Sequence, residues 1–316
     1  MAKPQKPLIS IVVPVFNEVD NVTIFHQRVS EVAASLTAYE FEFVFTDNHS
    51  SDGTFAALAE IAAADPRVRV FSFSRNFGFQ RSIWTGYTKA RGVAAIQLDV
   101  DLQDPPELIA DFIAHWESGY KVVYGIRRSR KEGRAITTAR KIFYRLVNVL
   151  SEDPIPVDAG DFRLVDRVVL DELIAMPDSQ PYLRGAIASL GFDQIGIPYD
   201  REARERGESK FSFKDLIGLS LDAILNHSII PLRIASYVGL TVAGVTLIGT
   251  IGMFIARWLF GADWPAGFAT TTVLILFSIS LNALFLGIIG EYLGRIYKQV
   301  KPSSITVIEK AIDSDR

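Results

Sequence analysis

Along the first 130 residues, short runs of apolar and β-branched residues alternate with longer stretches in which apolar residues recur every three or four positions. The runs are typical of buried strands, and the spacing is typical of amphipathic helices. We expect strands at residues 8–15, 41–46, 68–72, 93–98 and 120–124, and helices at residues 20–36, 52–64, 78–90 and 105–116, with Asp52 as the N-cap of the second helix. This alternation predicts a mostly parallel α/β sheet that binds its ligands at the carboxyl ends of the strands.

The apolar pattern changes near the C-terminus. Residues 234–256 and 266–290 contain no Asp, Glu, Lys or Arg. As helices, both segments are long enough to cross about 30 Å of hydrocarbon. Two buried helices of a soluble core are the alternative, but buried helices rarely run so long without a charge. We therefore expect a two-helix transmembrane hairpin.

Basic residues flank the outer sides of this hairpin: Lys210, Lys214 and Arg233 before it, and Arg295, Lys298 and Lys301 after it. The positive-inside rule then predicts a multi-pass protein of the inner (plasma) membrane, with both termini and the large N-terminal domain in the cytoplasm. The first ten residues lack the apolar core of a signal peptide. The expected parts are a cytoplasmic α/β domain (1–212), an amphipathic juxtamembrane segment (213–230), two spans (231–290) and a cytoplasmic tail (291–316).

Composition narrows the classes of function. Hydrophobic residues make up 49 % of the chain and charged residues 22 %, which excludes a disordered protein. The net charge of −3 shows no cationic bias toward nucleic acid. The chain has no cysteine, which excludes disulfides, thiol nucleophiles and cysteine-ligated metals, and its four scattered histidines argue against a histidine-rich metal site.

Polar clusters follow four of the expected strands, and parallel strands bring such clusters to one edge of a sheet. They are Asn17 and Glu18, residues 46–53, residues 74–76, and Asp99 to Asp104. In the last cluster Asp99, Asp101 and Gln103 alternate, so in an extended segment their oxygens point to one side and suit Mg²⁺ or Mn²⁺. The alternative is a solvated acidic turn in which Asp104 caps the following helix. The chain has no Walker loop, Gly-x-Gly-x-x-Gly or Gly-x-Ser-x-Gly motif, so P-loop, dinucleotide and hydrolase functions lack support.

Six motifs occur in order between residues 10 and 212: IVVPVFNE, TDNHSSDGT, SRNFGFQRSIWTGY, LDVDLQDPPE, VDAGDFRLVDR and REARERGESKFS. Together they resemble the polyprenyl-phosphate members of the family 2 glycosyltransferases, which include dolichyl-phosphate mannose synthases and bactoprenol (undecaprenyl-phosphate) glucosyltransferases. With two C-terminal spans, the chain most resembles the bactoprenol type. The resemblance implies a GT-A (Rossmann-like) fold, a nucleotide-sugar donor, a divalent cation and a polyprenyl phosphate acceptor.

The resemblance also implies roles for individual residues. The nucleotide pocket would contain Pro14, Phe16, Glu18 and Asp47, and the metal ligands would be Asp99, Asp101 and Gln103. The reacting centre would contain Asp161 and Arg163, with Asp158 as a second choice for the acid or base; the alternative for both aspartates is loop capping near Gly160. Phosphate groups would meet Arg127, Arg201, Ser209 and Lys210. Two departures, Asp47-Asn48-His49-Ser50 for the common Asp-Asp-Gly-Ser and Phe16 for a common Tyr, weaken the inference about the nucleotide and sugar.

The expected reaction is metal-dependent, inverting transfer of a sugar to a polyprenyl phosphate in cell envelope glycosylation. UDP-glucose is the first expected donor, with GDP-mannose and a modified UDP-pentose as alternatives; a non-catalytic, membrane-anchored nucleotide-sugar sensor is the alternative of a different class. Residues 127–145 form an expected basic amphipathic helix for an anionic membrane surface, or else a solvated charged face over a core stripe. The tail sequence ITVIEKAI is an edge-strand candidate for pairing with a neighbouring subunit, so we expect a homo-oligomer.

Overall fold

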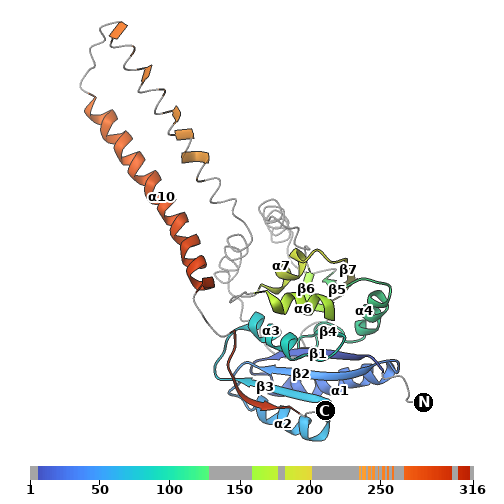
Figure 1. The fold of residues 1–316 in the computed structure, drawn as a ribbon. Helices are drawn as coiled ribbons and strands as arrows, with labels where there is room; N and C mark the ends of the chain where they lie inside the picture. Colours follow the sequence, from blue (N-terminus) through green and yellow to red (C-terminus); the bar gives the residue numbers. More distant parts are fainter. Residues whose placement is uncertain are drawn as a thin grey trace. The chain divides into compact units, whose positions relative to one another are not determined.

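The computed structural model describes residues 6–127, 159–176, 182–200, 267–300 and 305–313, together with separate positions between 235 and 259. The chain divides into two compact units. The first comprises residues 1–144, 153–210 and 302–316, and the second comprises residues 145–152 and 211–301. The first unit contains an α/β sheet, and the second contains the long helix α10 (Phe268–Val300) (Figure 1).

The described part of the first unit forms an eight-stranded sheet in the order β7-β5-β6-β4-β1-β2-β3-β8. Its strands are β1 (Leu8–Val15), β2 (Glu40–Asp47), β3 (Val68–Phe73), β4 (Ala94–Gln97), β5 (Val122–Arg127), β6 (Ala159–Asp166), β7 (Gln194–Tyr199) and β8 (Ile308–Ile312). Strands β6 and β8 run antiparallel to their neighbours, and the other pairs are parallel. The predicted mostly parallel sheet is therefore confirmed.

Helices cover both faces of this sheet. They are α1 (Val19–Ser35), α2 (Thr54–Ala64), α3 (Phe79–Lys89), α4 (Leu108–Glu117), α6 (Arg167–Ala175) and α7 (Leu183–Ser189). Side chains of α1, α2 and α4 belong to one core cluster, and those of α3, α6 and α7 belong to a second. Strand β1 contributes Ile11 and Val13 to the first cluster and Val12 to the second. Burial on both faces explains why this strand is continuously apolar.

Most of the expected elements agree with the structure to within two residues. The fourth helix starts at Leu108 rather than at 105, and the fifth strand extends to Arg127. The prediction of Asp52 as a helix N-cap was wrong. Gly53 occupies that position with φ 94°, and Asp52 lies one residue before it. The Asp52 carboxylate accepts from the backbone N–H of Thr54, the first residue of α2 (3.0 Å), and from the backbone N–H of Val19, the first residue of α1 (3.2 Å).

The tail returns to the sheet of its own chain. Strand β8 pairs antiparallel with β3, so the first unit contains residues from both ends of the sequence. We expected a separate tail after residue 290, whereas α10 continues to Val300 and residues 302–316 belong to the first unit. In this structure the edge-strand candidate pairs within the chain, and homo-oligomerisation stays a prediction.

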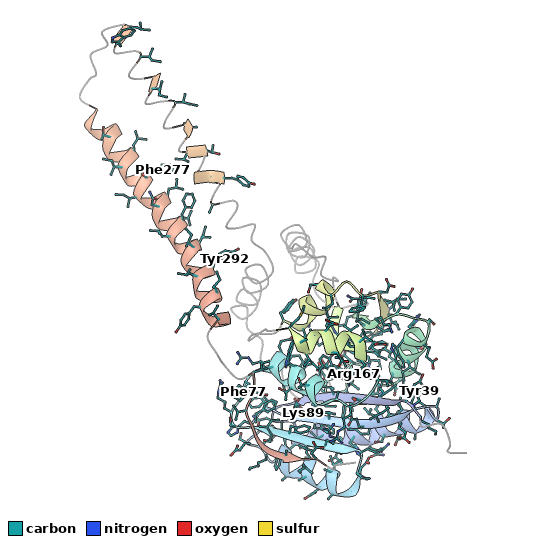
Figure 2. All side chains as sticks on the ribbon, viewed as in Figure 1. Tyr39, Phe77, Lys89, Arg167, Phe277 and Tyr292 are labelled. Atoms are coloured by element: carbon teal, nitrogen blue, oxygen red, sulfur yellow. The ribbon has the colours of Figure 1, made fainter. Side chains whose placement is uncertain are left out.

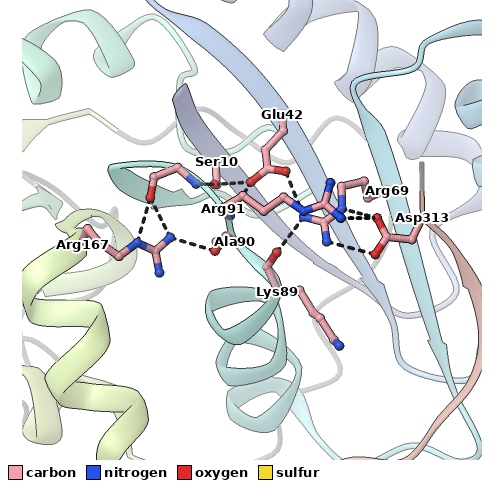
Figure 3. A network of polar contacts seen from close by, with 9 residues as sticks. Ser10, Glu42, Arg69, Lys89, Ala90, Arg91, Arg167 and Asp313 are labelled. Carbon is pink, nitrogen blue, oxygen red and sulfur yellow. Dashed lines mark hydrogen bonds and ion pairs between the residues drawn. The ribbon is translucent and has the colours of Figure 1, made fainter. Parts of the chain in front are cut away.

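A buried polar network joins β8 to the sheet (Figure 3). The guanidinium of Arg69 donates through Nε to Asp313 (2.6 Å) and through Nη1 to Glu42 (2.9 Å). The other oxygen of Glu42 accepts from Ser10 Oγ (2.6 Å) and from the backbone of Arg91 (2.6 Å). These contacts lie near the amino ends of β1 and β2, opposite the edge where the polar loops gather.

Helix α10 is the one described helix that is long and apolar enough to cross a membrane. Its window Phe277–Gly294 has a mean hydropathy of 1.4, and none of it is buried. Figure 2 shows side chains such as Phe277 projecting from this helix. The positions described between 235 and 259 are all helical, but they are separated, so the predicted first span stays a prediction. The basic helix expected at 127–145 and the juxtamembrane segment at 213–230 lie outside the described residues, apart from Arg127.

Candidate active site

Hydrogen bonds connect the loops that follow β1, β2 and β3. The backbone N–H of Asn17 donates to Ser50 Oγ, and the side chain of Asn17 accepts from the backbone of Ser51, both at 2.9 Å. The side chain of Asn48 accepts from the backbone of Phe77 at 2.8 Å. Strand β4 pairs with β1 in parallel, so the cluster Asp99 to Asp104, which follows β4, lies at the same end of the sheet as the loop that follows β1. The predicted convergence of the polar clusters is confirmed.

The four residues expected to bind the donor lie at or just after the carboxyl ends of β1 and β2, and they differ in solvent exposure. Pro14 is buried in β1, Phe16 is 44 % exposed and Glu18 is half-buried. Asp47, at the end of β2, is buried and accepts from the backbone of Ser50 and from Ser72 Oγ (2.7 Å). Its oxygens therefore fix the loop after β2 in this structure, and the role of these four residues in binding the nucleotide stays a prediction.

Asp99 and Asp101 follow β4 in a turn. The expected extended conformation was wrong, because Leu102 has φ 54° and the backbone of Gln103 donates to Asp101 Oδ1 (3.2 Å). The fully buried Gln97 donates through Nε2 to Asp99 Oδ1 at 2.8 Å and so fixes that carboxylate. The pKa of Asp99 is raised to about 7 by burial first and then by the nearby carboxylates of Asp104, Asp161 and Asp101. This excess of negative charge favours a bound cation.

The carboxylates at this edge fit a divalent cation held partly by substrate. Within the described residues, no three His, Cys, Asp or Glu side chains are arranged as a complete metal site. Mg²⁺ usually binds through one or two carboxylates together with waters and substrate phosphates, so a pair of aspartates is the set expected for an open site. The hydrogen bond from Gln97 to Asp99 is the kind of outer contact that orients a ligating carboxylate.

Asp104 points into the protein instead of capping the next helix. Its side chain is 1 % exposed and accepts from Tyr199 Oη (2.5 Å) and from Arg127 Nη2 (3.3 Å). Glu107 occupies the N-cap position of α4. The alternative of Asp104 as a cap was therefore wrong, because its carboxylate has a buried cation and a phenol as partners. Arg127, which was expected to meet phosphate, lies within electrostatic range of Asp99.

Asp161 and Arg163 lie on β6, in the middle of the sheet and not in a capping loop. Asp161 accepts two hydrogen bonds from Arg184, at 2.9 and 2.7 Å. Burial alone would raise the pKa of Asp161, but the hydrogen bonds and charge of Arg184 bring it below the ordinary value. Arg163 is buried and donates to the carbonyl of Gly160 at 2.9 Å.

Sequence reasoning missed three residues of this site: Gln97, Arg184 and Tyr199. Gln97 lies within β4, and Arg184 and Tyr199 contact residues that are far away in the sequence. No sequence motif therefore distinguishes these three residues. Four predicted site residues lie outside the described part of the chain: Asp158, Arg201, Ser209 and Lys210. Their roles stay predictions.

Comparisons with known proteins agree with this architecture. Residues 10–174 match the family described as Glycosyl transferase family 2. The chain is 39 % identical to the uncharacterized glycosyltransferase YkcC of Bacillus subtilis, covering 96 % of this chain and 93 % of the relative. It is 36 % identical to the bactoprenol glucosyl transferase of Shigella phage SfII, covering 96 % and 98 %.

Among solved structures, the mannosyltransferase PcManGT of Pyrobaculum calidifontis, in complex with GDP-Man and Mn²⁺, has a TM-score of 0.51 and 16 % identity. The match covers 92 % of this chain and 88 % of that one, and it supports the expected GT-A, Rossmann-like fold. The sheet, the polar edge and relatives that span nearly the full length agree with one another. The chain is therefore a glycosyltransferase that belongs to glycosyl transferase family 2 and resembles its bactoprenol glucosyltransferases.

Proposed function

We propose that this enzyme transfers glucose from UDP-glucose to a polyprenyl phosphate at the membrane surface, with a divalent metal and with inversion at the sugar. The observation on which this mainly depends is the placement of the Asp99 carboxylate and the Arg127 guanidinium at one edge of the sheet. That pair suits a metal-bound diphosphate beside a second phosphate. The 36 % identity to bactoprenol glucosyl transferases over nearly the whole chain supports the choice of substrates.

On the donor side, Asp99 and Asp101 would hold Mg²⁺ or Mn²⁺, with Gln103 as a third proposed ligand. When bound, such a cation neutralises charge that develops on the departing nucleoside diphosphate. Gln97 keeps the Asp99 carboxylate in one orientation, so no side-chain reorganisation is needed when the donor arrives. The PcManGT structure, solved with GDP-Man and Mn²⁺, gives a precedent for the metal on this fold.

On the acceptor side, a phosphate monoester has a second pKa of about 6 and is largely dianionic at neutral pH. Its oxygen forms the new bond to the anomeric carbon while the bond from that carbon to the nucleoside diphosphate breaks. Attack from the face opposite the leaving group inverts the carbon. A strong general base is not required, which agrees with an Asp161 that Arg184 keeps ionised. We assign Asp161 to positioning and Arg127 to the acceptor phosphate.

The exposed apolar surface of α10 supports a membrane location for the reaction. Leu286, Leu293 and Ile296 are each more than half exposed, as expected for side chains that meet lipid. A polyprenyl chain stays in the bilayer, so an enzyme that uses it gains from a membrane anchor. Two spans, cytoplasmic termini and oligomerisation are also parts of this proposal.

Two other donors are alternatives to UDP-glucose. GDP-mannose and a modified UDP-pentose are alternatives, because the loop Asp47-Asn48-His49-Ser50 departs from the common family sequence. The prediction of an enzyme is confirmed by family membership, which leaves the nucleotide-sugar sensor without support.

The test uses the full-length protein in lipid nanodiscs with undecaprenyl phosphate and three labelled donors: UDP-glucose, GDP-mannose and a UDP-pentose. We expect label in the lipid phase from UDP-glucose, its loss on chelation, and its return with Mg²⁺ or Mn²⁺. Asp99→Ala and Asp101→Ala should each abolish transfer, whereas Asp111→Ala, on the exposed side of α4, serves as the matched control. Better transfer to glycerol than to lipid phosphate, or full activity of either site variant, would refute the proposal.

A further inference from the structure

The side chains of Asp104, Arg127 and Tyr199 form a hydrogen-bonded ring at the carboxyl ends of β5 and β7. The Tyr199 hydroxyl donates to Asp104 Oδ1 (2.5 Å) and accepts from Arg127 Nε (3.3 Å). The Arg127 Nη2 group donates to Asp104 Oδ2 (3.3 Å). The phenol thus uses its one proton and one of its acceptor positions, and both oxygens of the carboxylate are engaged. A ring of this kind holds the guanidinium plane in one orientation.

Two glycines, Gly125 and Gly160, lie against the side chains of this ring. Arg127 and Tyr199 end the parallel strands β5 and β7 and are register partners. At Gly125, a Cβ atom would lie 2.5 Å from Tyr199 Cε1, and at Gly160 it would lie 3.3 Å from Arg127 Nη2. Any larger residue at Gly125 would displace the Tyr199 ring, so the absence of a side chain there permits the contact.

Burying the charged groups of this ring costs desolvation free energy, which offsets what their attraction contributes to the stability of the fold. The side chains of Asp104 and Arg127 are 1 % and 16 % exposed. Apolar residues of similar volume often stabilise a protein as well as a buried ion pair does, so stability alone is a weak reason for this one. Burial favours the neutral phenol and the Asp104 carboxylate adds to this effect, so the pKa of Tyr199 is raised and its hydroxyl keeps the proton it donates. Arg127 also lies within electrostatic range of Asp99, the proposed metal ligand.

We propose that Asp104 and Tyr199 are positioning residues that aim the guanidinium of Arg127 at the phosphate of the acceptor. Within the described residues, the hydrogen bonds of Arg127 use Nε and Nη2, so Nη1 is the group that meets the phosphate. Asp104 and Tyr199 touch neither substrate; they act through Arg127. This inference rests on the proposed function, because it takes the lipid phosphate as the ligand of Arg127.

The test is a pair of steady-state experiments on the full-length enzyme in nanodiscs. Tyr199→Phe removes the hydroxyl and keeps the ring, and we expect it to raise the KM for undecaprenyl phosphate about tenfold while the KM for the donor stays unchanged. In an Arg127→Lys background, which lacks the Nε donor, the same change should raise the acceptor KM by less than about twofold. Asp104→Asn should act in the same direction as Tyr199→Phe. Tyr124→Phe, a half-buried tyrosine on β5, is the matched control.

Each outcome separates the inference from the proposed function. Equal effects of Tyr199→Phe in both backgrounds would show that the residue acts on the fold and not through Arg127, and would overturn the inference. An unchanged acceptor KM in both Tyr199→Phe and Asp104→Asn would overturn it as well. In both cases wild-type transfer to lipid phosphate would leave the proposed function standing. Failure of the wild type to use any lipid phosphate would refute the proposed function and the inference with it.

Discussion

The network at the amino ends of the strands allows a quantitative prediction for Arg69→Met. Arg69 is 5 % exposed, lies on β3 and bonds to Glu42 on β2 and to Asp313 after β8. Methionine keeps much of the length of the side chain but removes all of its donors. Glu42, itself 7 % exposed, then retains only the hydrogen bonds from Ser10 and from the backbone of Arg91. The perturbation therefore leaves a buried carboxylate without its cation.

The expected loss follows from the burial of each partner. Removing one member of a buried ion pair costs about 3–5 kcal/mol of the free energy of unfolding, because the remaining charge is not compensated. Asp313→Asn removes only a half-buried charge from Arg69 and should cost about 1–2 kcal/mol. A domain of this size loses about 2–4 °C in melting temperature per kcal/mol, so Arg69→Met should lower it by about 6–20 °C.

The assay is thermal unfolding of the full-length protein in detergent, followed by tryptophan fluorescence. Arg91→Met is the matched control, since its side chain is 37 % exposed and its pair with Asp313 should contribute less than about 1 kcal/mol. A melting temperature of Arg69→Met equal to that of the wild type, or of Arg91→Met, would refute the assignment of the network as buried and mutually dependent.

Three further predictions concern two residues of the candidate active site and the packing of α3 against β1. The folded pKa of Asp99, about 7, lies above its ordinary 3.8, so the metal-free protein loses stability as the pH rises from about 4 to about 7. Asp99→Asn should therefore melt higher than wild type at pH 8 in chelator, and the two melting temperatures should converge toward pH 4. Equal melting temperatures at pH 8 would contradict this. Arg184→Gln should move the acid limb of the kcat profile to higher pH, because Asp161 loses the cation that keeps it ionised; an unmoved limb would show that Asp161 does not need to be charged. Gly86→Ala should destabilise the protein by about 1–3 kcal/mol in the same melting assay, since its Cβ would lie 2.2 Å from Val12 Cγ1, and a rise in melting temperature, as helix propensity alone predicts, would be the contrary result.

The parallel half of the fold was predictable because burial on both faces produces an unmistakable apolar run. Strands β1 to β5 contain predominantly apolar stretches, interrupted in β2 and β3 by the buried Glu42 and Arg69. Strand β6 does not, since it contains the buried charged residues Asp161, Arg163 and Asp166. Asp161 pairs with Arg184 on α7, Asp166 accepts from Trp116 on α4, and Arg163 donates to the carbonyl of Gly160 within β6. Strands β7 and β8 are half-exposed edges with short, mixed sequences. Those strands can be assigned only once their neighbours in the sheet are known.

Some residues of the candidate site could likewise be identified from a local sequence pattern, and others could not. Asp99 and Asp101 were found from the sequence because a pair of carboxylates after a buried strand is a local pattern. Arg184 pairs with Asp161 across 23 residues, and Tyr199 pairs with Asp104 across 95. No local sequence pattern indicates contacts between residues so far apart in the chain. Asp104 itself was noticed, but its helix-proximal position suggested a cap, and only the fold shows its buried partners.

The return of β8 to the sheet has a consequence for biosynthesis. On a ribosome the catalytic strands up to β7 emerge first, then the apolar helix α10, and only afterwards the strand that covers β3. Until then β3 is an open edge in the nascent chain, and open edges promote association between chains. Folding of the catalytic domain therefore finishes after the apolar helix has been synthesised, so translational stalling in the final segment would yield an exposed edge on an otherwise complete sheet.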